Sequence, residues 1–316
     1  MNKIKIVLSL ITRDNDYQRE QAKSAELVAH QLNVDLEVVY ANNDSVTQSS
    51  QLLDLMHKYK SELKGILVEP AGGTAFPQVG AAALRADTAW VVLNRDASSI
   101  ADLRQSSSSS APAFAVSTDH KQVGWIQAQQ LAAILPLGGT VLYLQGPASS
   151  TAAQHRLIGI EAAKSPNLIL KTIKSANWTE QGGYHAVSSW LRLSTSQQQP
   201  ICAVAAQNDF IALGARKAFE EAKPTLPHGP WSQLPFLGVD GLPRTGQAFV
   251  HSGSLVATVV VPPGAGVALE ALVKALTNGT EVPALRLIPS HSYPAIDKLK
   301  PIAVSAQQKA ASAVRS

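Results

Sequence analysis

The chain has 316 residues, a net charge of +4, 45% hydrophobic residues and 16% charged residues. This length exceeds what one core usually fills, so two domains are expected, and the composition excludes a disordered chain. The small net charge, without a dense Lys/Arg run, argues against nucleic acid as a partner. The single cysteine, Cys202, cannot form an internal disulfide, and its apolar neighbours predict an inert buried thiol.

The first part of the chain predicts alternating strands and helices. Near-continuous apolar runs are typical of strands covered on both faces, and amphipathic periodicity predicts the helices between them. The segment 101–113 contains five consecutive serines and is expected to be an exposed loop. We expect strands over 4–11, 34–41, 64–70, 88–96 and 114–120, and helices over 17–32, 45–59, 76–86 and 121–135.

The rest of the chain repeats the alternation. We expect strands over 139–146, 168–178, 201–208, 234–240 and 255–261, helices over 150–164, 179–193, 209–222, 242–251 and 264–278, and an extended piece over 284–291. Strands separated by helices of this length imply parallel sheets with right-handed crossovers, one over about 1–118 and one over about 119–261. The polar, small-residue end after Ile302 predicts a loose tail.

The N-terminal run MNKIKIVLSLIT could suggest a secretory signal, but it predicts a core strand instead. The apolar part is short, contains Ser9, meets the charged residues Arg13 and Asp14 directly, and has no A-x-A cleavage site after it. The expectation is therefore that either the chain is cytoplasmic or a signal peptide is absent from this sequence. No stretch reaches the roughly 18 apolar residues of a membrane span.

Polar side chains follow several predicted strands, and ligands of open α/β sheets bind outside the carboxyl ends of the strands. Arginine, carboxylate and amide groups can bond ring hydroxyls, while an aromatic ring stacks on a sugar face. This mixture suits a ligand that is a polar ring with hydroxyls. The candidate ligand groups are Asp14, Asn15, Tyr17, Glu69, Asn94, Arg95, Arg156, Trp178, Asn208 and Asp240.

Helix capping is the alternative interpretation of these positions. Any single Asp or Asn at a strand-to-helix junction more often serves as an N-cap than as a ligand group. Capping does not account for Arg95 at a strand end, Arg156 on an apolar helical face or the bulky Trp178. Within AQND, we expect Asp209 to be the cap or first-turn charge and Asn208 to face the ligand.

Catalytic patterns are absent from the sequence. It contains no P-loop, no nucleophile elbow, no G-x-G-x-x-G after the first strand and no H-x-x-x-H pair. Ser61 and Lys64 match S-x-x-K on a charged helix end, which is a poor place for a nucleophile. Glu69 and Asp240 could form an acid/base pair, but hydrogen-bond acceptance is the simpler role. We expect a binding protein without cofactor or metal, not an enzyme.

Three stretches resemble the sugar-binding type I periplasmic binding proteins, the ribose-binding group above all. They are AVAAQNDFIALGARKA, LGVDG followed by SLVATVVVPP, and VVLNRD. LacI-type repressor cores share the fold. The resemblance extends from the first strand to about residue 290. It implies an α/β protein of two Rossmann-like lobes joined by three crossings, near Asp119, Val261 and Leu287, which close on a ligand like a hinge.

The implied lobes are 1–118 with 262–286 and 119–261 with 287–302, followed by the tail 303–316. Matched residue by residue, the resemblance assigns ligand contacts to Asn15, Tyr17, Asn94, Arg95, Arg156, Trp178, Asn208 and Asp240. Four positions depart from the family pattern: Gln18, Asn94, Val239 and Val261. They remove two aromatic rings, a carboxylate and an amide, so the site is not expected to be ribose-specific. The arginines also suit an acidic sugar, a sugar lactone or another oxygen-rich molecule.

The resemblance implies a periplasmic, monomeric solute-binding protein that captures a sugar or related polar ligand between its lobes and delivers it to a membrane ABC permease. The alternative is a ligand sensor, cytoplasmic or periplasmic, that signals to a kinase or transcription regulator. A self-contained repressor would need a helix-turn-helix segment of about 50–60 residues before the first strand. The sequence begins at that strand, so such a repressor is not expected.

Overall fold

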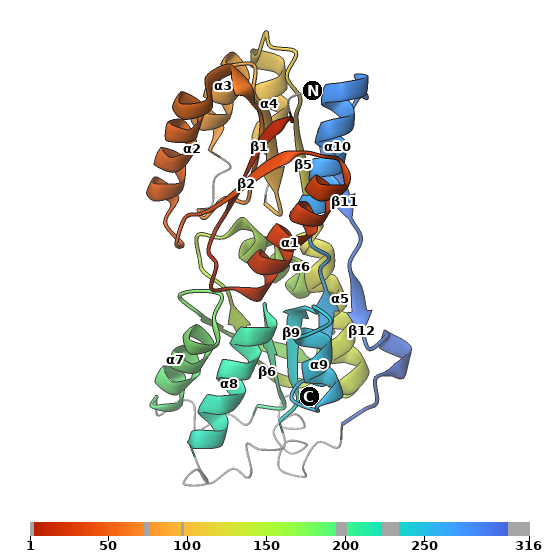
Figure 1. Ribbon diagram of the computed structural model, residues 1–316. Coiled ribbons are helices and arrows are strands. Elements are labelled where there is room, and N and C mark those ends of the chain that lie inside the picture. The colour runs from red at the N-terminus through yellow and green to blue at the C-terminus, as the bar shows by residue number, and fades with distance from the viewer. Residues whose placement is uncertain (1–2, 73–75, 96–97, 194–200, 223–233, 303–316) are drawn as a thin grey trace. The chain divides into compact units, whose positions relative to one another are not determined.

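The computed structural model describes residues 3–72, 76–95, 98–193, 201–222 and 234–302 (Figure 1). The chain divides into two compact units, Met1–Thr118 with Pro263–Ile288 and Asp119–Pro262 with Pro289–Ser316. It therefore passes between the units three times, and the second and third passages lie slightly later than the expected bounds. Asp96 and the expected tail 303–316 lie outside the described residues.

The first unit is built on a parallel sheet. Its strand order is β11-β5-β4-β3-β1-β2, and every pairing in it is parallel. The central strands are buried on both faces, as their unbroken apolar runs predict. The strands are β1 (Lys5–Leu10), β2 (Asp35–Tyr40), β3 (Leu63–Val68), β4 (Ala89–Leu93), β5 (Ala113–Thr118) and β11 (Leu285–Ile288).

Helices cover both faces of this sheet (Figure 1). On one face, α1 (Asp16–Gln31) and α10 (Ala265–Asn278) pack against the strands, so this layer includes a helix from near the far end of the sequence. The other face is covered by α2 (Ser45–Tyr59), α3 (Pro77–Arg85) and α4 (Ser98–Ser106), with a short 3-10 turn at Lys60–Glu62.

Helix α4 corrects the expectation of an exposed loop over 101–113. Its residues Ile100 and Leu103 are buried against the sheet, three positions apart on one helical face. The serine run drew attention to the polarity of the segment, but Ser106 still belongs to the helix. Only the residues after it, up to β5, are irregular.

The second unit has a sheet of the same order, β12-β10-β9-β8-β6-β7. Its pairings are parallel except that β12 runs antiparallel to β10 at the edge. The sheet is parallel as expected, apart from this edge strand, which the sequence did not predict. The strands are β6 (Gly139–Gln145), β7 (Leu168–Lys174), β8 (Ala203–Ala206), β9 (Phe236–Asp240), β10 (Ala257–Val260) and β12 (His291–Tyr293).

Two helical layers cover this sheet. Helices α5 (His120–Ile134) and α6 (Thr151–Ala163) bury their apolar side chains on one face. On the other face lie α7 (Glu180–Leu191), α8 (Asp209–Glu221) and the short α9 (Gly246–His251), which begins later than expected. A 3-10 turn at Ile296–Lys298 follows β12. Within the described ranges, no helix combines the length and apolar character that a membrane span requires.

Glycines allow α5 and α6 to approach each other closely. A Cβ atom at Gly124 would lie 2.1 Å from the Arg156 carbonyl oxygen, and one at Gly159 would lie 2.0 Å from the Lys121 carbonyl oxygen. Replacing either glycine by alanine would therefore force the two helix backbones to move apart. This crossing therefore sets the position of α6, the helix that carries Arg156.

We predict that Gly159→Ala lowers the free energy of unfolding by about 1–3 kcal/mol, because the added methyl group forces the two helices apart. Urea denaturation measures the change. The control is Glu161→Ala in the same helix, where the side chain is exposed and the expected change is within about 0.5 kcal/mol. Equal stability of the two variants would contradict the close crossing.

Candidate functional site

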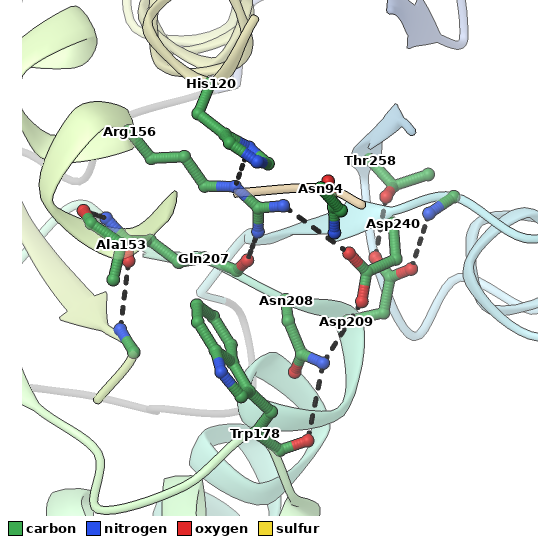
Figure 2. A network of polar contacts seen from close by, with 12 residues as sticks. Asn94, His120, Ala153, Arg156, Trp178, Gln207, Asn208, Asp209, Asp240 and Thr258 are labelled. Atoms are coloured by element: carbon green, nitrogen blue, oxygen red, sulfur yellow. Dashed lines mark hydrogen bonds and ion pairs between the residues drawn. The ribbon is translucent and has the colours of Figure 1, made fainter. Parts of the chain in front are cut away.

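The buried side chain of Arg156 is the centre of a polar group in the second unit, shown in Figure 2. Its Nε donates to His120 Nδ1 at 3.4 Å, and its Nη1 donates to the Gln207 carbonyl oxygen. Its Nη2 lies 3.8 Å from Asp240 Oδ1, and its guanidinium lies 5.6 Å from the ring centroid of Trp178. Four different elements or their flanking loops thus fix the orientation of one cation.

Gln207 fixes the loop that precedes α6. Its Oε1 accepts from the Gly146 backbone, and its Nε2 donates to the Tyr143 hydroxyl at 3.0 Å and to the Ala153 carbonyl at 2.9 Å. The side chain is fully buried, and all its bonds hold neighbouring segments. Burial raises the pKa of the Tyr143 hydroxyl, so it stays protonated. The Gln207 side chain therefore fixes the backbone whose carbonyl oxygen accepts from Arg156.

Asn208 is the N-cap of α8, so of the two positions expected for Asp209, the cap and the first turn, Asp209 takes the first turn. The Asn208 Oδ1 accepts from the Ile211 backbone at 2.7 Å. Its Nδ2 donates to Asp240 Oδ2 at 3.2 Å and to the Trp178 carbonyl at 3.4 Å. One amide therefore both starts a helix and joins two other candidate residues. That Asn208 also contacts a ligand stays a prediction.

Asp209 is the first residue of α8, and it is buried rather than exposed in the first turn. Its Oδ2 accepts from the Gly241 backbone at 2.8 Å, and its Oδ1 accepts from the Thr258 hydroxyl at 2.6 Å. Burial first, and then the negative charge of Asp240, raise the pKa of the Asp209 carboxyl well above its ordinary value.

Trp178 lies beyond the strand in which we expected it. Strand β7 ends at Lys174, and Trp178 directly precedes Thr179, the N-cap of α7. The ring lies close to Gly146, where an added Cβ would meet it at 2.2 Å. The half-buried indole is thus held against the β6–α6 loop, next to Arg156.

In the first unit, the buried carboxylate of Glu69, just after β3, joins three other polar side chains, two that follow β4 and one from α1. Its Oε1 accepts from Arg95 Nη1 at 3.1 Å and from Asn94 Nδ2 at 3.2 Å. Its Oε2 accepts from Gln21 Nε2 at 3.1 Å. Arg95 also donates to the Asn94 carbonyl at 2.7 Å. Glu69 therefore balances the charge of Arg95, and its further role as a ligand group stays a prediction.

The loop after β1 carries Asp14 and Asn15, and Tyr17 follows in the first turn of α1. Asn15 is the N-cap of α1 and accepts from the Gln18 backbone, while Asp14 is exposed and Tyr17 is buried. The Gln18 Oε1 accepts from the Ile11 backbone at 3.0 Å, so this residue holds the loop where the family pattern has an aromatic ring. Ligand contacts of Asp14, Asn15 and Tyr17 stay predictions.

The two valine departures are fully buried. Val239 belongs to β9, and Val261 directly follows β10 and donates its backbone N–H to the Asp240 carbonyl at 3.0 Å. Neither side chain can form a hydrogen bond, so these positions contribute shape alone.

The structure brings Arg156, Trp178, Asn208 and Asp240 together in one unit and Glu69, Asn94 and Arg95 in the other. The sequence interpretation missed three supporting residues: His120, Gln207 and Asp209. Each stands at the start of a helix or just before one, as the candidates Asn15 and Asn208 do, so their position was a usable signal. Across the described residues, no group of three or more His, Cys, Asp or Glu side chains is placed to hold a metal ion.

We predict that Glu69→Ala lowers the free energy of unfolding by about 3–5 kcal/mol, because it leaves the Arg95 guanidinium buried without its carboxylate. Thermal and urea denaturation measure the loss. Glu62→Ala, at an exposed position before β3, is the control and should change little. A loss below about 1 kcal/mol would show that the Glu69–Arg95 pair is not closed in solution.

We predict a pH-dependent stability difference between the wild type and Asp209→Asn. Because the native pKa of Asp209 is raised, the stability that its proton contributes is complete below the unfolded pKa of about 3.9 and is lost as pH rises through the native pKa. Urea denaturation between pH 4 and pH 8 should therefore show the wild type losing stability relative to the variant. A constant difference over this range would contradict the raised pKa.

Comparisons with known proteins agree with this architecture. A xylitol-binding protein of Mycolicibacterium smegmatis is 29% identical over 275 residues, which cover 84% of this chain and 69% of that protein. The allose-bound periplasmic solute binding protein of an Actinobacillus succinogenes ABC transporter is 23% identical with a TM-score of 0.77, covering 92% and 97%. A fructose binding periplasmic domain of a hybrid two component system is 21% identical with a TM-score of 0.77, covering 92% and 90%.

The last two likenesses show the fold alone, because their sequence identities are low. The family assignment comes from a profile described as "Periplasmic binding protein domain", which matches residues 6–281 and so most of the chain. The chain therefore belongs to the periplasmic binding protein domain family.

Proposed function

We propose that this chain captures a small, neutral, polyhydroxylated molecule, a sugar or a polyol, for an ABC importer. The observation that carries the proposal is the Arg156 group of the second unit. A buried guanidinium, a carboxylate, an amide and an indole ring converge at the carboxyl ends of β6, β8 and β9. Hydroxyl groups can accept from the cation and donate to the carboxylate, and a sugar's apolar face can stack on the ring.

The charge balance supports a neutral ligand rather than an acidic one. Arg156 lies 3.8 Å from Asp240, and Arg95 lies 3.1 Å from Glu69. Each arginine is thus already paired with a carboxylate of its own unit. A ligand carboxylate would have to compete with these groups at short range, and repulsion between like charges is costly where water is excluded.

One of the relatives with curated function supports the same ligand class, since a protein named for binding xylitol is 29% identical to this chain. The valines at 239 and 261 lack the ring and the amide that the ribose-binding pattern places there. A site with fewer hydrogen bonds loses affinity for a sugar whose hydroxyls stay unpaired, by roughly 1–3 kcal/mol for each. Ribose should therefore not be the preferred ligand.

The partner and the location are part of the proposal. We infer a monomer that works in the periplasm and docks on a membrane permease, as a protein of this family would. The second candidate is a sensor domain, which is favoured by the fold it shares with the fructose binding domain of a hybrid two component system. Capture of the permease components by the tagged, ligand-bound protein would support import, whereas capture of a histidine kinase alone would support sensing.

We predict that isothermal titration detects binding of xylitol, D-allose or D-fructose, and that D-ribose binds more weakly than the best of these. Xylitol and D-xylonate form a matched pair, with the same carbon count and a different charge. Xylitol should bind at least tenfold more tightly. Tighter binding of D-xylonate than of xylitol would contradict the proposal that the ligand is neutral. Micromolar binding of D-ribose that is tighter than binding of the other probes would contradict the inferred specificity.

In the same assay, Arg156→Ala should weaken binding by about 2–5 kcal/mol, because it removes a buried donor and leaves Asp240 without its cation. Arg156→Lys keeps the charge but loses the forked geometry of the guanidinium. Its affinity should therefore lie between those of the wild type and Arg156→Ala. Arg192→Ala, an exposed arginine next to the C-terminal end of α7, is the matched control and should bind as the wild type does. Unchanged affinity of Arg156→Ala would remove this residue from the site.

A further inference from the structure

The backbone that presents Asp240 has an unusual conformation. Asp240 has a φ of 106°, a region that side-chain-bearing residues rarely adopt, and Gly241 follows with a φ of 57°. A Cβ atom at Gly241 would lie 2.7 Å from Val260 Cα, so the turn is also tight. Such a conformation costs of the order of 1–3 kcal/mol and persists only where neighbouring groups hold it.

The carboxylate of Asp209 is the group that holds this turn. Its Oδ2 accepts from the Gly241 N–H at 2.8 Å, directly after the strained residue. The carboxylate lies in a space that glycines leave open, because a Cβ at Gly238 or Gly246 would lie 2.1 Å from one of its oxygens. The strand before the turn and the helix after it are thus both shaped around Asp209.

A second contact fixes the other carboxylate oxygen. Asp209 Oδ1 accepts from the Thr258 hydroxyl at 2.6 Å, and Thr258 is a fully buried residue of β10. The Thr258 carbonyl accepts from Gln130 Nε2 at 2.9 Å, and the same nitrogen donates to Ser292 Oγ at 2.9 Å. Asp209 is therefore anchored to a strand that is itself held by α5 and β12.

From these contacts we propose that Asp209 is a positioning residue of the ligand site, which aims the Asp240 carboxylate by holding the Gly241 backbone against Thr258. The proposal rests on the proposed function of Asp240 as a ligand group. Asp209 itself does not touch the ligand. Its effect on affinity passes through the Asp240 carboxylate, whose oxygens face Arg156 and Asn208.

The burial of a carboxyl group at this position supports a specific role. Asp209 is 2% exposed, and its pKa is raised, so the fold bears a desolvation cost there. A first-turn aspartate that only favours the helix dipole would gain the same benefit on the surface without this cost. The hydrogen bonds from Gly241 and Thr258 offset this desolvation cost. They connect Asp209 to the turn that carries Asp240 and to the neighbouring strand β10.

The ligand-free test is hydrogen–deuterium exchange of the peptide that contains Gly241, in the wild type, Asp209→Asn and Asp209→Ala. Asparagine can accept from Gly241 N–H and donate to Thr258 if the hydroxyl rotates, whereas alanine can do neither. Asp209→Ala should accelerate exchange at Gly241 at least tenfold, and Asp209→Asn by much less. Peptides of β7 serve as the internal control.

The binding test uses xylitol and D-allose as probes. Asp209→Ala should weaken the affinity at least tenfold, and Asp209→Asn should restore most of it. In an Asp240→Ala background, Asp209→Ala should change the affinity less than twofold, because the group that it positions is already gone. A merely structural loss would weaken binding by the same factor in both backgrounds and would overturn the proposal.

A further variant covers the case in which Asp209→Ala does not fold. Thr258→Val keeps the carboxylate and its bond to Gly241 but removes one anchor, so it should weaken the affinity about threefold or more and accelerate Gly241 exchange. Wild-type affinity together with wild-type exchange in Thr258→Val would overturn the proposal. If neither probe binds the wild type, the proposed ligand class fails, while the exchange experiment still decides whether Asp209 holds the turn.

Discussion

The burial of the Arg156 guanidinium is the constraint on which the second unit depends. A buried cation requires partners that satisfy its donors and its charge, and this one takes them from His120, the Gln207 backbone, Asp240 and the face of Trp178. These partners come from segments far apart in the sequence. Their convergence is possible because parallel strands direct all their carboxyl ends to one edge of the sheet.

The first unit has a similar arrangement around a buried anion instead of a buried cation. There the central group is a carboxylate, Glu69, and the partners are Gln21, Asn94 and Arg95. In both units an arginine and an acid are held close together before any ligand binds. Such preorganised polar groups need to rearrange little when a ligand binds. The conformational entropy that their side chains lose on binding is therefore smaller.

The sequence carried most of the fold, because apolar runs and helical periodicity record burial directly. The expected loop over 101–113 was wrong for residues 101–106, which belong to α4 and include the buried Leu103. Strand β12 was not predicted, since a short antiparallel edge strand leaves no distinct sequence pattern. For the site, Arg156 and Asp240 could be chosen as candidate ligand groups from their residue types and their positions after predicted strands. The sequence left open whether Asp209 caps α8 or lies in its first turn. The structure places it in the first turn, with Asn208 as the cap and the Asp209 carboxylate bonded to Gly241 and Thr258.

A crystal structure of the chain grown with xylitol or D-allose tests the central claim most directly. We expect ligand hydroxyls within hydrogen-bond distance of Arg156 and Asp240, with the Trp178 ring against an apolar face of the ligand. A bound ligand that contacts none of these three side chains, while Arg156 keeps its partners His120 and Gln207, would show that the buried guanidinium supports the fold and not the site.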